Sequence, residues 1–183
     1  GYGAMFETTT GSVNTAVGTY AMYDNTTGQY NSCVGEAALR KNTTGTHNAS
    51  FGYRSMFENT TGGSNTAVCN AALYNNTTGG HNTSVGYHSF YHSQTANYNV
   101  GLGYQAGYNV TTGDRQVAVG YQALRNATTG GHNVALGYYA LQASTTAGSN
   151  VAIGEEAMRY TTTGSNNVGI GREALDAYTT GYE

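Results

Sequence analysis

The stretch GSNVAIGEEAMRYTTTG, residues 148–164, is one copy of a 17-residue unit that fills the chain. We number the unit from 1 to 17, so that the small residue ending Thr-Thr-Gly is position 17. A strict short period indicates one structural unit stacked on copies of itself, and this repetition decides the fold. Position 17 recurs without insertion or deletion at Gly11, Gly28, Gly45, Gly62, Gly79, Ala96, Gly113, Gly130, Ala147, Gly164 and Gly181.

The unit combines a strand pattern with a turn pattern. Positions 3 to 7, as in Asn150–Gly154, alternate with period two, which is typical of a β-strand. Thr-Thr-Gly is turn chemistry, because glycine accepts positive φ and threonine hydroxyls bond nearby backbone groups. Known helical repeats need about 33 residues, so a helical pair does not fit. The pattern predicts an all-β fold, a β-solenoid of about ten coils, with a second short strand at positions 9 to 12.

Asparagine occupies position 3 in almost every unit, with Gln116 as the exception. Stacked asparagines can hydrogen-bond from one strand to the next through their side-chain amides. With neighbouring coils about 4.8 Å apart, ten coils make a rod about 50 Å long. We therefore expect a structural ladder along the rod, formed by Asn14, Asn31, Asn48, Asn65, Asn82, Asn99, Asn133, Asn150 and Asn167.

Residues 1–183 form a single repeat solenoid with two sub-regions. Position 4 is polar or small within residues 1–92 and valine within residues 97–183, and the change falls beside the degraded unit Ser93–Ala96. Both ends of the sequence fall inside a unit, without a cap. Because open strand edges recruit other chains, we expect these residues to be a segment of a longer protein, or their ends to be closed by partners.

A row of small residues bears on association. Position 5 holds only Ala, Cys, Ser or Gly, and position 7 is almost always Gly. A face made only of small residues suggests that another stretch of backbone approaches it closely. That backbone could belong to the opposite wall of the same coil or to a neighbouring subunit. We favour the subunit, because a thin 17-residue coil buries little surface by itself.

Composition excludes several classes of function. The net charge is −3, only 9% of residues are charged, and no basic cluster suits nucleic acid or an anionic membrane. No apolar run approaches the roughly 20 residues of a membrane span. Nucleotide loops, nucleophile elbows and metal-binding motifs are absent, so we predict a protein that is not an enzyme and needs no cofactor. His47, His81 and His132 share position 2 but lie in separate coils, so no metal site is expected.

Aromatic residues gather in the middle of the chain, and tyrosine recurs at position 8. Aromatic rings with polar tips suit contacts with sugars or proteins. They could equally stack as ladders that shield the thin core. The candidate partner is a cell-surface glycan or protein receptor, and the candidate binding residues are Tyr87, His88, Tyr91, His92, Tyr104 and Tyr108.

Asn150–Ala157 and Asn167–Ala174 resemble the YadA-like head repeats of trimeric autotransporter adhesins. The unit Asn-Thr-Ala-Val-Gly followed by Asn-Thr-Thr-Gly, as in residues 14–28, is similar to repeats of phage tail fibres. The resemblance implies a left-handed β-roll, assembled as a parallel homotrimer and used as an adhesive head or fibre shaft. It also implies an extracellular, cell-surface or virion location. The unit is longer than that of the adhesin heads, and we expect the difference to enlarge the Thr-Thr-Gly loop.

Two other functions stay open. One is a self-assembling extracellular filament with no specific ligand, and the other is an ice-binding solenoid, suggested by the threonine columns. Ice binders generally present threonines spaced one apart on a strand, whereas adjacent threonines before glycine belong in a turn. Positions 8, 9, 12 and 13 vary widely from coil to coil, which favours an adhesive surface over a bare shaft.

Overall fold

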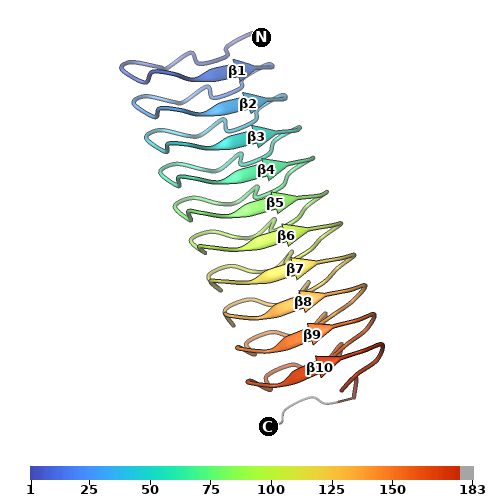
Figure 1. The fold of residues 1–183 in the computed structure, drawn as a ribbon. Helices are drawn as coiled ribbons and strands as arrows, with labels where there is room; N and C mark the ends of the chain where they lie inside the picture. Colours follow the sequence, from blue (N-terminus) through green and yellow to red (C-terminus); the bar gives the residue numbers. More distant parts are fainter. Residues whose placement is uncertain (178–183) are drawn as a thin grey trace.

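The computed structural model describes residues 1–177, which form one rod of stacked coils (Figure 1). Each complete coil contributes one three-residue strand, and no helix occurs in this part of the chain. The predicted all-β solenoid is therefore confirmed. The strands are β1 (Thr15–Val17), β2 (Ser32–Val34), β3 (Ala49–Phe51), β4 (Thr66–Val68), β5 (Thr83–Val85), β6 (Val100–Leu102), β7 (Val117–Val119), β8 (Val134–Leu136), β9 (Val151–Ile153) and β10 (Val168–Ile170).

All ten strands belong to one parallel sheet in chain order, with β1 at one end of the rod and β10 at the other (Figure 1). Neighbouring strands pair in register at an offset of one unit, so Val151 lies beside Val168. The degraded unit does not interrupt the sheet, because β5 and β6 pair in the same way. Every repeated side chain therefore stacks on its equivalent in the next coil.

The predicted second strand at positions 9 to 12 is wrong. The backbone there adopts positive φ at positions 9 and 11, as at Tyr20 (55°) and Met22 (50°), whereas a parallel strand needs φ near −120°. Non-glycine residues pay about 1–2 kcal/mol for this left-handed conformation. Bonds between coils offset the cost, since the Met22 N–H donates to the Ala38 carbonyl at 3.0 Å and Asp24 N–H to Arg40 at 2.9 Å.

The interior of most coils holds one large apolar side chain and several small ones. In the ninth coil, Ala152 at position 5, Ala157 at position 10 and Met158 at position 11 are all fully buried. The small residues of position 5 face this inner wall: the Ser50 hydroxyl, for example, donates to the Ser55 carbonyl at 2.9 Å. Our expectation that a neighbouring subunit meets position 5 was wrong, because the chain itself supplies the close approach.

One interior ring accounts for two glycines of the sixth coil. Phe90 is the largest fully buried side chain, at a position where most coils hold Leu or Met. A Cβ added at Gly101 would lie 2.5 Å from Phe90 Cε2, and one added at Gly107 would lie 2.5 Å from Phe90 Cε1. Glycine at these two places therefore makes room for the phenylalanine ring.

Positions 4 and 6 lie on the outward face of the sheet. In β9, for example, Ala152 is buried while Val151 is half-buried and Ile153 is exposed. The change from polar residues to valine at position 4 therefore alters the outer surface of the rod and leaves its interior packing unchanged.

Candidate functional site

The predicted asparagine column lies inside the rod and ties each coil to itself and to its neighbour. Asn31 Nδ2 donates to the carbonyl of Gly45 in the same coil at 2.8 Å, and Asn31 Oδ1 accepts the N–H of Asn48 in the next coil at 2.9 Å. All nine predicted asparagines stand in this column. Gln116 continues the column in the one coil that lacks an asparagine at position 3. Its backbone N–H donates to Asn99 Oδ1, and its Oε1 accepts the backbone N–H of Asn133. Buried amide groups need hydrogen-bond partners. These asparagines find theirs within the rod, so the column has a structural role.

A second buried asparagine column escaped the sequence analysis. Asn42 Nδ2 donates to Asn25 Oδ1 at 2.8 Å and to the Gly45 carbonyl at 3.1 Å, and the pattern repeats through Asn59 and Asn76. The signal was present in the sequence, since asparagine occupies position 14 in four consecutive units. The column ends at Ser93, whose shorter side chain leaves Asn76 Oδ1 and Ser93 Oγ buried without partners.

Thr-Thr-Gly turns form a convergent contact between coils. The N–H groups of Thr26, Thr27 and Gly28 all point at the Thr43 carbonyl, at 3.0, 3.1 and 3.2 Å. The Thr26 hydroxyl donates to the same oxygen at 3.0 Å. Gln94 replaces one such threonine and keeps its backbone bond to the Thr111 carbonyl at 3.0 Å. The degraded unit loses the hydroxyl contact, and the Ala96 N–H makes no bond to this carbonyl.

Positions 8, 9, 12 and 13 make up what we call the variable face. Apart from Arg115, Asp114 and Glu183, every Lys, Arg, Asp and Glu of the chain occupies one of these four positions. The interior and the turns repeat nearly the same residues in each coil. Chemical diversity is therefore concentrated on the variable face, where the predicted binding residues also lie.

A column of rings at position 12 runs through the middle of the variable face. Ring centroids are 5.3 Å apart for Phe57 and Tyr74, 5.0 Å for Tyr74 and Tyr91, and 5.5 Å for Tyr91 and Tyr108. A guanidinium covers each end, with Arg40 lying 5.6 Å from the Phe57 centroid and Arg125 lying 5.5 Å from that of Tyr108. Cations over ring faces are attracted by the ring quadrupole, so the arginines stabilise the column.

A second column at position 8 contains only tyrosines, and we call it the tyrosine column. Centroid separations are 5.5 Å for Tyr87 and Tyr104, 5.1 Å for Tyr104 and Tyr121, and 5.3 Å for Tyr121 and Tyr138, with planes within 17° of parallel. These four side chains are 40–45% exposed. Because each ring covers the face of the next, the column presents ring edges to solvent rather than open ring faces.

Two histidines pack against these rings, and His88 joins the two columns. The His88 ring stacks on Tyr87 at 3.9 Å and lies 4.7 Å from Tyr91, while His92 lies 4.9 Å from both Tyr91 and Tyr108. Burial lowers the pKa of both imidazoles, and the nearby His92 lowers the pKa of His88 further. The structure thus brings the predicted binding residues into one aromatic cluster, with Tyr104 attached through Tyr87. Sequence reasoning missed the flanking Arg40 and Arg125.

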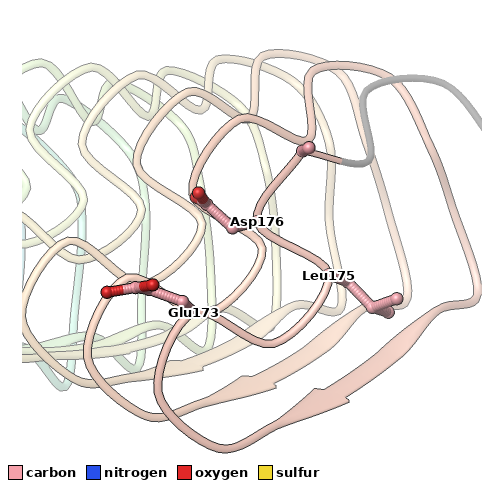
Figure 2. A pocket seen from close by; sticks show the side chains of 4 residues that line it. Glu173, Leu175 and Asp176 are labelled. Atoms are coloured by element: carbon pink, nitrogen blue, oxygen red, sulfur yellow. The ribbon is translucent and has the colours of Figure 1, made fainter.

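Other candidate sites are weak. The histidines of position 2 are exposed, and two of them stack on tyrosines: His47 on Tyr30 and His81 on Tyr98. Within residues 1–177, no group of three His, Cys, Asp or Glu side chains could hold a metal ion. A hollow beside the last described coil is lined by Glu173, Leu175, Asp176 and Ala177, and Figure 2 shows Glu173 and Leu175 pointing in opposite directions. These side chains define no common binding point.

No described helix is long and apolar enough to cross a membrane. No protein-family model, curated protein or solved structure matches the chain. The resemblance to adhesin heads and tail fibres consequently stays a prediction, carried by the repeat sequence itself.

Proposed function

We propose that this chain is a segment of a structural and adhesive fibre located outside the cell, on a cell surface or a virion. Parallel copies pack side by side, three of them if the resemblance to adhesin heads holds, and the variable face attaches to a glycan or protein receptor. The observation that supports this proposal is the division of the rod surface into an uncharged sheet face, apolar throughout at position 6, and a separate variable face.

The outward sheet face, which we call the sheet strip, comprises positions 4 and 6 of all ten coils. It contains no charged residue, and position 6 is always apolar. Several of these side chains are strongly exposed, including Val17 at 54% and Val34 at 42%. A monomer seldom exposes a contiguous apolar patch beyond a few hundred Å², and larger patches generally mark interaction sites.

The dimensions of the sheet strip suit a second copy of the same rod. Ten strands about 4.8 Å apart and three residues wide cover roughly 50 by 10 Å, or about 500 Å². Two facing strips would bury about 1,000 Å² in total, near the lower limit for a biological interface. A parallel copy also matches the strip along its length. The coils with polar or small residues at position 4 would face their equivalents, and the coils with valine at position 4 would face theirs.

The variable face is suited to attachment because neighbouring coils differ there. Stacked rings flanked by arginines form a preorganised surface, which reduces the entropy cost of binding. The ring faces are covered, so the surface offers hydroxyl groups, ring edges and guanidinium groups to a partner. This chemistry favours polar contacts with a glycan or protein over the stacking of sugar rings on open aromatic faces.

Association is tested by sedimentation equilibrium on the purified chain. We expect a trimer, and we expect Val134→Lys combined with Leu136→Lys to give monomers, because the two lysines would lie inside the interface. Thr129→Lys is the matched control, since it adds charge at the exposed position 16 and should leave the mass unchanged. A wild-type chain that stays monomeric at all concentrations would contradict the proposal.

Attachment is tested by binding of the fibre to its target cells or particles. Tyr91→Ala and Tyr104→Ala should weaken attachment while circular dichroism shows an intact fold. Tyr30→Ala removes an equally prominent aromatic ring at position 2, outside the variable face, and serves as the control. Attachment that is unaffected by the first two variants would exclude the variable face as the binding surface.

The first alternative is a filament without a specific ligand. The buried asparagine columns and the uninterrupted sheet support it, because they explain the repeat by stability alone. Electron microscopy of the native assembly separates the two functions: a bare filament would show continuous rods, and variable-face substitutions would have no effect on attachment.

Ice binding is the less favoured alternative. The threonines of position 16 form an exposed column in register, as at Thr27, Thr44 and Thr61, which is the arrangement that this function would use. The neighbouring position 15 hydroxyls are occupied by bonds between coils, as for Thr43 and Thr60, so only a single column stays free. A thermal-hysteresis assay decides this alternative.

A further inference from the structure

We propose that the tyrosine column is a site of oxidative cross-linking, at which a peroxidase-type one-electron oxidant using hydrogen peroxide joins tyrosines of consecutive coils as dityrosine. Tyr104 and Tyr121 are the principal pair. The product is a covalent tie between two coils that the sequence places 17 residues apart.

Distance and exposure together favour this pair, since Tyr74 and Tyr91 are slightly closer, at 5.0 Å, but less exposed. The Tyr104 and Tyr121 centroids are 5.1 Å apart with planes 8° from parallel, the closest approach within the column. Both side chains are about two-fifths exposed, at 41% and 40%, so an oxidant can reach their phenol edges. Backbone bonds hold the two coils in register, since the Gln122 N–H donates to the Tyr104 carbonyl at 2.9 Å. Two oxidised rings at this site meet without diffusion, and such preorganisation greatly raises the effective concentration.

The chemistry balances with one equivalent of peroxide. Each phenol gives up one electron and its hydroxyl proton to become a phenoxyl radical. The two radicals form a new carbon–carbon bond between ring carbons ortho to oxygen, and the hydrogens on the joined carbons shift to the oxygens and restore both phenols. Two electrons and two protons leave the protein in total, and they convert one hydrogen peroxide to two waters.

Other tyrosines provide an internal comparison. Tyr30 and Tyr98 are 52% and 54% exposed, more than any member of the tyrosine column. Each stacks on a histidine of a neighbouring coil, His47 and His81 respectively, at 4.9 Å. They are therefore open to oxidation without a tyrosine partner beside them. Cross-linking set by stacking should favour the column, whereas cross-linking set by exposure should favour Tyr30 and Tyr98.

The experiment treats the purified chain with horseradish peroxidase and hydrogen peroxide, followed by dityrosine fluorescence and peptide mass mapping. We expect a linked peptide pair that contains Tyr104 and Tyr121 and has lost two hydrogens, with a yield that does not depend on protein concentration. The variant Tyr104→Phe with Tyr121→Phe keeps the stacked rings but lacks the phenols, so this peptide pair should disappear. Tyr30→Phe with Tyr98→Phe is the matched control and should retain it.

Denaturation supplies a readout that does not depend on any variant. In urea the preference for Tyr104 with Tyr121 should vanish, because the coils no longer hold the rings together. The proposal is overturned if the folded wild type yields no dityrosine where free tyrosine couples. It is equally overturned if linked peptides follow exposure, or if their yield rises with concentration as for links between colliding rods.

Discussion

At the scale of single residues, the next coil sets the permitted side-chain size. Glycine at position 7 adopts φ near +135°, as at Gly18 and Gly103, a region that side chains rarely enter. A Cβ added at Gly103 would also lie 2.5 Å from the Gly120 carbonyl oxygen of the next coil. Cys69 is the one exception at position 7 among the described residues, and its φ of 109° departs from the values of its glycine equivalents.

Cys69→Gly should therefore stabilise the rod by about 1 kcal/mol, because it relieves backbone strain of that order. Urea denaturation measures the gain. Cys69→Ala is the control, since it removes the thiol and keeps the Cβ, and it should give no comparable gain. Equal effects of the two substitutions would show that the strain lies elsewhere.

Positions 14 and 17 are coupled within each coil. A Cβ added at Gly62 would lie 2.5 Å from Asn59 Oδ1 and still closer to the Gly79 carbonyl oxygen, so the asparagine at position 14 and the next coil both disfavour a side chain at position 17. Alanine occupies position 17 only at Ala96 and Ala147 among the ten complete units, and both follow a serine, Ser93 or Ser144, at position 14. The shorter serine side chain provides the space that the alanine methyl group occupies.

Ser93→Asn alone should destabilise the rod, because its amide would collide with the Ala96 methyl group. The double variant Ser93→Asn with Ala96→Gly should extend the second asparagine column, with the new Nδ2 donating to the unpartnered Asn76 Oδ1. A double-mutant cycle in urea should give a favourable coupling of about 1 kcal/mol or more. Strictly additive free energies of unfolding would refute the steric coupling of these two positions.

At the scale of elements, a coil is one short strand and a series of turns held by bonds to its neighbours. The alternation at positions 3 to 7 was enough to place the strand. The second strand predicted at positions 9 to 12 does not form, because Tyr20 and Met22 adopt positive φ, which sequence rules associate with glycine. Bonds between coils select this conformation, and a single-coil pattern carries no sign of them.

The residues that make up the aromatic cluster could be predicted from the sequence, whereas their contacts could not. Tyr87, His88, Tyr91 and His92 are close in sequence, so their grouping required only the repeat. Their contact with Tyr108, one coil further along, and the coverage of the ring column by Arg40 and Arg125 depend on side-chain directions. The inward direction of position 5 was likewise undetermined, because the apolar residues of position 6, which would ordinarily face a core, lie on the opposite face of the strand.

The histidines of this cluster should make stability depend on pH. The pKa of both His88 and His92 lies below the ordinary value of 6.5 in the folded chain, chiefly through burial. The unfolded chain therefore binds more protons as the pH falls below about 6.5, and the free energy of unfolding decreases until the folded-state pKa is passed. Stability should be full above pH 6.5 and reduced at lower pH.

Thermal unfolding between pH 7.5 and pH 4.5 checks this expectation. The double variant His88→Gln with His92→Gln should show a smaller decrease in melting temperature over this range than the wild type. His132→Gln, at the exposed position 2, is the control and should leave the decrease unchanged. A decrease of equal size in all three proteins would assign the pH dependence to other groups.

At the scale of the whole molecule, each coil contacts only its two neighbours, so the rod should tolerate the loss of one whole unit. Deletion of residues 118–134 joins position 4 of one coil to position 5 of another and preserves the register. We expect a folded rod shortened by about 4.8 Å, because that is the spacing of paired strands. Small-angle scattering measures the length, and circular dichroism the sheet content.

Deletion of residues 118–133 is the matched control, since it removes one residue fewer. The joined coil would then hold one residue too many, so part of it would slip by one residue against its neighbours and turn its side chains to the opposite face of the sheet. This variant should lose cooperative unfolding. Equal stability of the two deletions would mean that the rod does not depend on its register.

The bonds between coils run along the rod axis, and this direction determines how the molecule responds to tension. A pull on the two ends loads one coil interface at a time, so coils detach singly from an end while the remaining stack holds. A freed unit of 17 residues extends to roughly 55 Å, compared with about 4.8 Å in the rod. Under load the protein is thus an extensible tether that dissipates mechanical work in discrete steps, and a dityrosine between coils would set where the unravelling stops.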